Sequence, residues 1–267
     1  MLDRFSRNIQ YLRISVTDRC NLRCTYCMPE TGVELLDKRD ILSLEEIVEV
    51  VRTGVSKFGI RKIRFTGGEP LVRKGIVELV EQVSSLEGIE ETAMTTNGIL
   101  LADYATALKK AGLKRVNISL DTLSPVKFRA ITRGGDVEKV KEGIKAARSA
   151  GLTPVKINVV KTEYTDPEEL DALREYCRSN DLEIRYIRQM NLETGSFSKI
   201  EGGSSGNCAL CNRLRLMSNG NIKPCLFGNQ GFSIRELGIE KAFQLALDHK
   251  PLKGEASVTH QFYNIGG

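Results

Sequence analysis

Three cysteines near the start of the chain have the types and spacing needed to bind an inorganic cofactor. Cys20, Cys24 and Cys27 form a C-x3-C-x2-C array within one short loop. Three thiolates from a tight loop suit a [4Fe–4S] cluster, which otherwise takes four cysteines, so one iron would stay open to another ligand. A zinc knuckle and a disulfide framework are the alternatives. Zinc sites usually use paired C-x2-C arms with a fourth protein ligand, however, and no histidine lies near this array.

A second group of three cysteines lies far along the chain. Cys208, Cys211 and Cys225 have the spacing C-x2-C-x13-C, with no fourth ligand close by. They offer three thiolates to a second metal centre. A structural zinc that recruits a distant histidine is the alternative, although the chain has only His249 and His260. Cys177 follows the helical apolar positions of its segment and is predicted to be a core residue.

A third group of residues could bind phosphate. Basic residues lie on several predicted strands at positions that face inward, and Arg is suited to bidentate contacts with phosphate. Lys62 and Arg64 are two positions apart, so they point to the same face of one strand. Burying an unpaired basic residue costs free energy, and either a bound polyanion or carboxylates of the fold would offset this cost. The candidates on predicted strands are Arg13, Lys62, Arg64, Lys156 and Arg185, and Arg213 and Arg215 are added because they lie beside the second cysteine array.

Ordinary acid–base or nucleophilic catalysis has little support in this sequence. Both histidines lie in the tail, and no paired carboxylates or Ser–His arrangement occur. The chemistry is therefore expected to come from cofactors, with no catalytic residue beyond their ligands.

Composition indicates a globular protein in a reducing compartment. The 267 residues are 41% hydrophobic and 27% charged, and 39 basic against 34 acidic residues give a net charge of +5. This excess gives little reason to expect nucleic acid, and no apolar run is long enough to span a membrane. The first residues form no secretion signal, and seven cysteines with uneven spacing fit metal binding better than disulfides. We expect a cytoplasmic protein.

Strand and helix patterns alternate from residue 10 to about 190. Six strand–helix units imply a parallel sheet with helices outside it, and six is short of the eight that close a barrel. An α/β fold with an open, partial (β/α)6 barrel of the TIM type is predicted, with a doubly wound sheet as the alternative. Strands are predicted at 11–16, 62–66, 92–95, 115–120, 154–160 and 183–188, and helices at 44–58, 76–83, 102–111, 136–150 and 167–178.

The unusual residues follow the ends of these strands, where barrels of this kind place their active sites. The first cysteine array follows strand one, and Gly67-Gly68-Glu69-Pro70 follows strand two. Residues 1–190 are therefore predicted to form the barrel. Residues 191–207 are rich in Gly and Ser and predict a linker or lid, and residues 208–267 predict a small C-terminal iron–sulfur domain with a helix near 239–247.

The first array, with Tyr26 before its last cysteine, resembles the radical S-adenosylmethionine (SAM) superfamily. In that superfamily SAM chelates the open iron through its amino and carboxylate groups. Gly67-Gly68-Glu69-Pro70 is similar to the GGEP element that holds the methionyl ammonium, although such a sequence can also be merely a turn. The resemblance implies a set of SAM-binding residues, several of which could instead be plain strand-end or core residues. They are Tyr26, Gly68, Glu69, Thr95, Ser119 and Met190.

A longer string is similar to a narrower family, the MoaA family of GTP 3′,8-cyclases in molybdenum cofactor biosynthesis. It is Leu-Arg-Ile-Ser-Val-Thr-Asp-Arg-Cys-Asn-Leu-Arg-Cys-Thr-Tyr-Cys-Met-Pro at 12–29, together with Cys-Asn-Arg-Leu-Arg-Leu at 211–216. This resemblance implies a second [4Fe–4S] cluster on Cys208, Cys211 and Cys225 whose open iron contacts the purine of GTP. It also implies that the seven basic residues above bind GTP. Gly266-Gly267 would reach into the active site, although terminal glycines usually fray.

The same resemblance implies the reaction and the partners. Cleavage of SAM would give a 5′-deoxyadenosyl radical that abstracts hydrogen from C3′ of GTP. Joining C3′ to guanine C8 would give (8S)-3′,8-cyclo-7,8-dihydroguanosine 5′-triphosphate, so the enzyme would be a lyase. An external electron donor of the ferredoxin or flavodoxin type would supply the first cluster, and cyclic pyranopterin monophosphate synthase would act downstream. A homodimer is compatible with the family.

The chain departs from this family in one stretch. Members usually carry several dozen more residues between the sixth strand and the second cysteine array, where this chain has only 191–207. Two other functions therefore stay open. One is a radical SAM enzyme with an auxiliary cluster that modifies a peptide or another small metabolite, without dependence on GTP. The other is a non-enzymatic two-cluster electron carrier or sensor, which would not turn over SAM.

Overall fold

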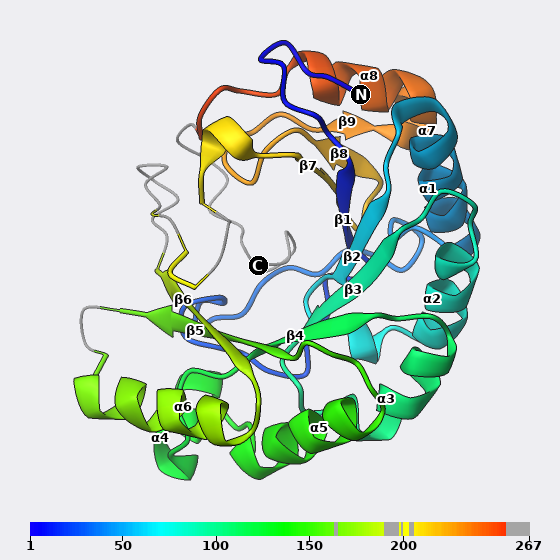
Figure 1. Cartoon of the computed structure of the whole chain (residues 1–267). Coiled ribbons are helices and arrows are strands. Elements are labelled where there is room, and N and C mark those ends of the chain that lie inside the picture. Colours follow the sequence, from blue (N-terminus) through cyan, green and yellow to red (C-terminus); the bar gives the residue numbers. More distant parts are fainter. Residues whose placement is uncertain (163–164, 190–197, 199, 203–205, 255–267) are drawn as a thin grey trace.

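The chain folds into an open α/β barrel (Figure 1). The structure is a computed structural model, and it describes residues 1–162, 165–189, 198, 200–202 and 206–254. Six parallel strands lie side by side in chain order. They are β1 (Tyr11–Ser15), β2 (Lys62–Thr66), β3 (Glu91–Thr96), β4 (Arg115–Ser119), β5 (Lys156–Lys161) and β6 (Glu183–Arg188). The predicted partial barrel is confirmed, since the sheet does not close.

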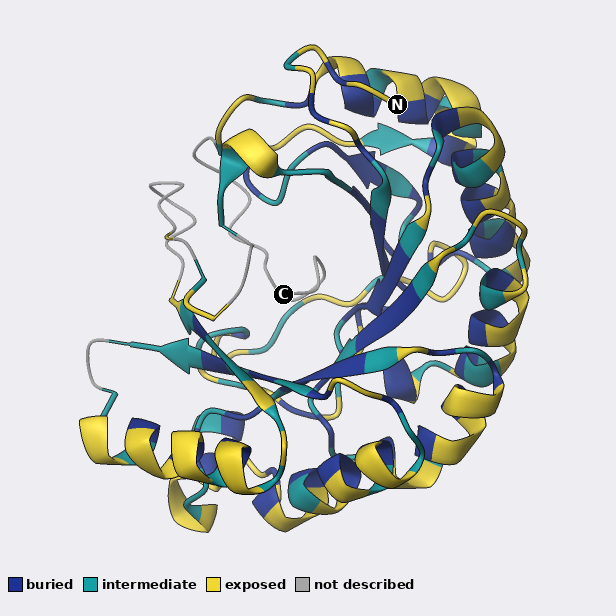
Figure 2. Cartoon of the chain, viewed as in Figure 1, coloured by how far each residue is buried: buried dark blue, intermediate teal, exposed yellow. Residues whose placement is uncertain are grey.

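Helices cover the outer face of these strands (Figure 1). They are α1 (Leu44–Phe58), α2 (Ile76–Ser84), α3 (Leu101–Lys110), α4 (Pro125–Thr132), α5 (Val137–Ser149) and α6 (Pro167–Ser179). The sequence dictates α1 clearly: Ser43 and Glu46 form a capping box at its start, and Gly59 ends it in the left-handed conformation at φ 66°. Figure 2 shows the helices buried toward the strands and exposed on their outer sides. The sequence patterns did not predict α4.

The segment that carries the second cysteine array extends the same sheet. After the short 3-10 helices η1 (Pro70–Val72) and η2 (Cys208–Leu210), strand β7 (Arg213–Leu216) pairs in parallel with β1. Strands β8 (Asn221–Lys223) and β9 (Phe232–Ser233) then add antiparallel. The full sheet therefore has the order β6-β5-β4-β3-β2-β1-β7-β8-β9.

Two helices follow these strands, α7 (Ile234–Leu237) and α8 (Ile239–Asp248). Helix α8 packs on α1, where the rings of Phe243 and Phe58 stack at 4.9 Å between centroids. Residues 208–254 thus share a sheet and a core with the barrel strands. The division into a barrel at 1–190, a linker at 191–207 and a separate domain at 208–267 stays a prediction.

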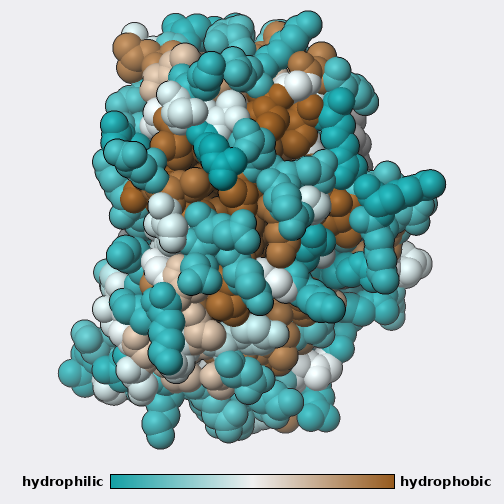
Figure 3. Space-filling view, turned by 90° about the vertical axis from the view of Figure 1, so that its right-hand side faces the viewer, coloured by the Kyte–Doolittle hydropathy of each residue, from teal (hydrophilic) through white to brown (hydrophobic). Residues whose placement is uncertain are grey.

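The outer surface carries mainly hydrophilic side chains. Figure 3 shows this for the face on the right of Figure 1, where apolar groups appear in bands between polar ones. None of the helices in the described part of the chain has the length and apolar character needed to cross a bilayer.

Candidate active site

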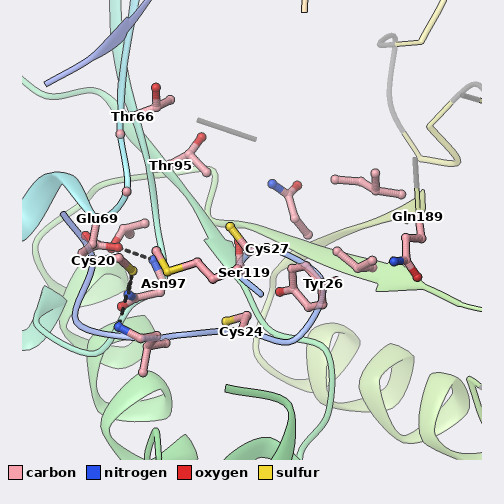
Figure 4. A pocket seen from close by; sticks show the side chains of 18 of the residues that line it. Cys20, Cys24, Tyr26, Cys27, Thr66, Glu69, Thr95, Asn97, Ser119 and Gln189 are labelled. Atoms are coloured by element: carbon pink, nitrogen blue, oxygen red, sulfur yellow. Dashed lines mark hydrogen bonds between the residues drawn. The ribbon is translucent and has the colours of Figure 1, made fainter. Parts of the chain in front are cut away.

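The first cysteine array lies in the loop after β1 and lines a cavity of about 220 Å³ (Figure 4). The predicted SAM-binding residues come to this cavity from the ends of neighbouring strands. Those that line it are Tyr26, Gly68, Glu69, Thr95 and Ser119. Met190, the sixth residue of that set, lies outside the described residues. The convergence expected from the strand-end motifs is therefore present at the carboxyl edge of the sheet.

The Gly-Gly-Glu-Pro loop rests directly on the backbone that leads to the first cysteine. The amide of Gly68 donates to the carbonyl of Thr17 at 2.8 Å, and the amide of Glu69 donates to the carbonyl of Arg19 at 2.8 Å. A Cβ atom on Gly68 would lie 2.2 Å from the Arg19 carbonyl oxygen. Only glycine allows this close approach, so Gly68 fixes the position of the cysteine loop.

The buried carboxylate of Glu69 connects the ends of β2 and β3. Its Oε1 accepts from the Leu71 amide at 3.0 Å and from the Thr96 hydroxyl at 2.7 Å, and its Oε2 accepts from the Asn97 amide at 2.7 Å. Burial raises the pKa of Glu69 to about 7, against the opposing effect of these three hydrogen bonds. A carboxylate has about four acceptor positions, so one is still free for a ligand cation.

Asn97 is a site residue that sequence reasoning missed. Its Nδ2 donates to the Asn21 side chain at 2.8 Å and lies 3.8 Å from the sulfur of Cys20. It therefore ties the β3 end to the cysteine loop. The available signal was its place in Thr95-Thr96-Asn97-Gly98, directly after a strand.

Tyr26 connects the cysteine loop to the other side of the barrel. Its hydroxyl donates to Oδ2 of Asp121 at 2.8 Å, and Oδ1 of Asp121 accepts from the Val160 amide at 2.8 Å. Burial, partly offset by these two bonds, raises the pKa of Asp121. Burial and the neighbouring Asp121 raise the pKa of the Tyr26 phenol well above its usual value. Asp121, too, was absent from the predicted site.

The three thiols of the first array fit a cationic metal cluster. Burial, followed by the nearby Cys27 and Asp121, raises the pKa of Cys24 to about 12. Burial and Cys20 raise the pKa of Cys27 to about 11. Thiolates in such a place need positive charge between them, and iron supplies it. Three sulfur donors beside a cavity also leave room for a ligand on an open iron.

The second array lines a neighbouring cavity of about 140 Å³. Cys208, Cys211 and Cys225 share it with Arg13, Arg213, Arg215 and the unpredicted Lys250. Ile187, Arg188 and Leu226 line both this cavity and that of the first array, so the two cavities adjoin. The structure thus places the two cysteine arrays in adjoining cavities.

Three arginines form a row across the sheet beside the second array. In the strand register Arg13 of β1 pairs with Arg64 of β2 on one side and with Arg215 of β7 on the other. Each is at most 9% exposed. Burial is the largest cause that lowers the pKa of these arginines, and repulsion from neighbouring guanidinium groups is the next. The pKa of Arg13 falls well below its usual value, and that of Arg215 falls to about 10. This row strongly favours an anionic ligand.

Tyr11, which was not predicted, lies among these arginines. Its hydroxyl accepts a short hydrogen bond from Nε of Arg64, and the guanidinium groups of Arg64 and Arg213 lie 5.8 and 5.7 Å from its ring centroid. Burial alone would raise the pKa of this phenol, but the arginines outweigh burial and lower it.

The other predicted phosphate ligands differ in their surroundings. Lys156 forms a short ion pair with Glu183, so a carboxylate of the fold already neutralises it. Burial, followed by the nearby Arg115 and Arg64, lowers the pKa of Arg185. Lys62 is half-buried at the start of β2, in register with Tyr11. Gly266 and Gly267 lie outside the described residues.

Comparison with known proteins identifies the family. Residues 14–177 match the family described as Radical SAM superfamily. The chain is 41% identical to a GTP 3′,8-cyclase of Peptoclostridium acidaminophilum, covering 100% of this chain and 98% of that protein. It is 44% identical to a GTP 3′,8-cyclase of Moorella thermoacetica, with 88% of this chain and 86% of that protein covered.

The alignment with the first relative shows a difference in length. It is 321 positions long whereas the chain has 267 residues, so that relative carries several dozen residues that this chain lacks.

Solved structures share the fold. Streptococcus suis SuiB bound to S-adenosylmethionine superposes with a TM-score of 0.69 at 17% identity, over 92% of this chain and 65% of that chain, which is just under two thirds. Native anSMEcpe with bound AdoMet gives a TM-score of 0.64 at 17% identity, over 90% of this chain and 82% of that chain. With the curated relatives at 41% and 44% identity, these findings mean that the chain belongs to the radical SAM superfamily and, within it, to the GTP 3′,8-cyclase family.

Proposed function

We propose that this protein is a radical SAM GTP 3′,8-cyclase, a lyase that converts GTP to (8S)-3′,8-cyclo-7,8-dihydroguanosine 5′-triphosphate. This is the first step of molybdenum cofactor biosynthesis. The observation that carries the proposal is the buried row of Arg64, Arg13 and Arg215, which lies beside the second cysteine array. Buried cations in register suit a triphosphate, because the anion offsets both their desolvation and their mutual repulsion.

Two [4Fe–4S] clusters and SAM are the cofactors of this activity. Cys20, Cys24 and Cys27 would hold the first cluster, and the second array would hold the other. When bound to the first cluster, SAM supplies the 5′-deoxyadenosyl radical that takes hydrogen from C3′ of the substrate. Bond formation between C3′ and guanine C8 would then close the new ring, and the resulting nucleotide radical would take one electron, from the external donor, and one proton to give the 7,8-dihydro product.

The residues around the first cavity position the cosubstrate. Glu69, through its remaining acceptor position, would take the methionyl ammonium of SAM. Gly68 would let the backbone approach it, and Tyr26, held by Asp121, would form the wall beside the cysteine loop. Thr95, Ser119 and Met190 would contact the rest of SAM.

The cations hold the substrate across the barrel. Arg13, Arg64, Arg185, Arg213 and Arg215, with Lys62 and Lys156, are the proposed GTP ligands. For Lys156 this requires the triphosphate to share or displace its ion pair with Glu183. Gly266 and Gly267 are proposed to reach the substrate from the tail.

The shortened stretch supports a second candidate. The Peptoclostridium acidaminophilum relative has several dozen residues that this chain lacks. We propose that they belong before the second cysteine array, where their loss would leave more room for a substrate. A radical SAM enzyme that modifies a larger substrate, such as a peptide, would use the same two cysteine arrays. It would release deoxyadenosine without GTP.

Partners and location follow from the proposed activity. A ferredoxin or flavodoxin would deliver the electron to the first cluster, and cyclic pyranopterin monophosphate synthase would consume the product. Seven free cysteines suit the reducing cytoplasm. A homodimer is also proposed, on the family resemblance alone.

Binding of GTP to matched variants tests the proposal. Arg213→Ala combined with Arg215→Ala should weaken GTP binding by at least about a hundredfold, because each charged contact to phosphate contributes on the order of 1.5–3 kcal/mol. Arg174→Ala, which removes an exposed arginine on α6, should leave GTP binding unchanged. The proposal would be contradicted by an unchanged GTP affinity in the double variant. It would also be contradicted if the rate of deoxyadenosine release did not depend on GTP.

A further inference from the structure

Lys250 is a fully buried lysine that neither the fold nor the proposed substrate contacts account for. It lies two residues after α8 and is 1% exposed. Its ammonium donates to the carbonyls of Arg213 at 2.6 Å and Pro224 at 2.7 Å, and to the sulfur of Cys211 at 3.5 Å. An ammonium has three donors, and all three are used.

These contacts join the two segments that carry Cys211 and Cys225. Arg213 lies two residues after Cys211, and Pro224 directly precedes Cys225. The loop between them contains the β7–β8 hairpin, so a single ammonium closes its two ends around the cysteines. Lys250 therefore fixes the distance between two of the three ligands of the second array.

Among the described residues, sulfur and not a carboxylate lies against the ammonium of Lys250. The salt bridges within the described residues include none to Lys250. A buried ammonium without an anionic partner is strongly unfavourable. Cys211 and Cys225 are its anionic neighbours when their thiols are ionised, as they are in an iron–sulfur cluster.

Arg7 supports the same arrangement from the other side. Its guanidinium donates to the carbonyl of Cys208 at 2.8 Å and to that of Pro251 at 2.8 Å. Asp3 neutralises Arg7 through an ion pair at 2.7 Å. Arg7 thus anchors Cys208 and the residue after Lys250, but it adds little net charge beside the second array, whereas Lys250, Arg213 and Arg215 all place positive charge near its cysteines.

The first array has the opposite electrostatic surroundings. Tyr26 lies between Cys24 and Cys27, and its hydroxyl donates to the carboxylate of Asp121. Asn97 approaches the Cys20 sulfur with its side chain, and its backbone amide donates to the carboxylate of Glu69. Both arrays have hydrogen bonds to sulfur, since the Leu22 amide donates to the Cys20 sulfur at 3.4 Å. The difference between the arrays is therefore one of charge: nearby carboxylates stabilise the oxidised form of a cluster, and nearby cations stabilise its reduced form. The two arrays are therefore built for different reduction potentials.

We propose that Lys250 is a positioning residue for the second cluster, because it holds the segments of Cys211 and Cys225 together. Its positive charge also raises the reduction potential of the second cluster above that of the first. The consequence is that an electron entering the protein is more stable on the second cluster. This inference rests on the two clusters of the proposed function but not on the identity of the substrate.

Potentiometric titration followed by EPR tests the inference without any activity assay. The titration is done in a Cys20→Ser, Cys24→Ser, Cys27→Ser background, where only the second cluster forms, and in the matching Cys208→Ser, Cys211→Ser, Cys225→Ser background. The second cluster is expected to reduce at the higher potential. Lys250→Met should lower that potential, Lys250→Arg should keep most of it, and Lys253→Met, at an exposed lysine nearby, should leave it unchanged.

Iron content covers the case in which a variant loses the cluster. Loss of iron from Lys250→Met and Lys250→Gln, with retention in Lys250→Arg, supports the role of the charge. The inference is overturned if the reduction potential of the second cluster is unchanged in Lys250→Met. It is also overturned if Lys250→Arg loses the second cluster as completely as Lys250→Met does. About four irons in the unmodified chain, instead of about eight, would contradict the two-cluster premise itself.

Discussion

The guanidinium of Arg64 donates a hydrogen bond of 3.2 Å to the hydroxyl of Thr95. Arg64 belongs to the row proposed to bind GTP, and Thr95 lines the cavity proposed to bind SAM. This contact is a physical connection between the two binding sites. The affinity for one ligand should therefore depend on the presence of the other.

Thr95→Val should weaken that coupling. The valine keeps the shape of the side chain but removes the acceptor, which costs about 0.5–1.5 kcal/mol of interaction with Arg64. Anaerobic GTP titrations with and without SAM measure the coupling, and a double-mutant cycle with Arg64→Lys isolates the pair. If SAM shifts GTP affinity equally in the unmodified protein and in Thr95→Val, this contact does not couple the sites.

Tyr11→Phe should weaken GTP binding about tenfold. The change removes the acceptor of the Arg64 Nε hydrogen bond and frees that guanidinium from its present orientation. Calorimetric GTP titration checks this, with Tyr104→Phe on the outer helix α3 as the control. Full affinity in Tyr11→Phe would mean that the arginines orient themselves without the phenol.

SAM binding should strengthen as the pH rises through about 7. Burial raises the folded-state pKa of Glu69 to about 7, above the value of about 4.3 for an unfolded glutamate. Below pH 7 the folded protein therefore holds a neutral Glu69, and above it the carboxylate is charged and attracts the methionyl ammonium. The same shift makes the contribution of Glu69 to folding stability fall as the pH rises from the unfolded to the folded pKa.

Glu69→Gln provides the control for that titration. SAM affinity in this variant should be weak and independent of pH over about 6 to 8. Its amide nitrogen would also face one of the three buried donors, at a cost of about 1–3 kcal/mol in unfolding free energy. A pH dependence identical to that of the unmodified protein would assign the titration to another group.

Tyr26→Phe should destabilise the loop of the first array. Oδ2 of the buried Asp121 would lose its donor, at a cost of about 1–3 kcal/mol. Thermal unfolding of the apoprotein and iron retention after reconstitution measure the effect, which should be smaller in Tyr26→Phe combined with Asp121→Asn. Equal loss in both variants would show that Asp121 is not the relevant partner.

The six barrel strands and most of their helices could be predicted from local patterns. Strand β2 has the predicted bounds, Lys62–Thr66, and its polar and apolar residues alternate, while α1 has both its capping box and its terminal glycine. Helix α4 was missed because its buried residues are few and its apolar stripe is weak. Strand β7 was missed because Arg213-Leu-Arg-Leu216 lies next to a cysteine and has only four residues. Its alternation was visible, but its pairing with β1 is a long-range contact.

The site was predictable to the extent that its residues lie in short motifs. The two cysteine arrays could be recognised from spacing alone, whereas Gly68 and Glu69 were predicted through the resemblance to the GGEP element. Lys250, Tyr11 and Asp121 could not, because their roles depend on distant partners: Lys250 on Pro224, Tyr11 on Arg64, and Asp121 on Tyr26. Sequence periodicity contains no information about which residue meets a buried charge.

The most direct test of the central claim follows the abstracted hydrogen. The reconstituted protein is incubated anaerobically with reductant, SAM and GTP that carries deuterium at C3′, and the 5′-deoxyadenosine is analysed by mass spectrometry. The proposed cyclase predicts one deuterium in the deoxyadenosine and a matching amount of 3′,8-cyclised nucleotide. Unlabelled deoxyadenosine, formed at the same rate without GTP, would contradict it.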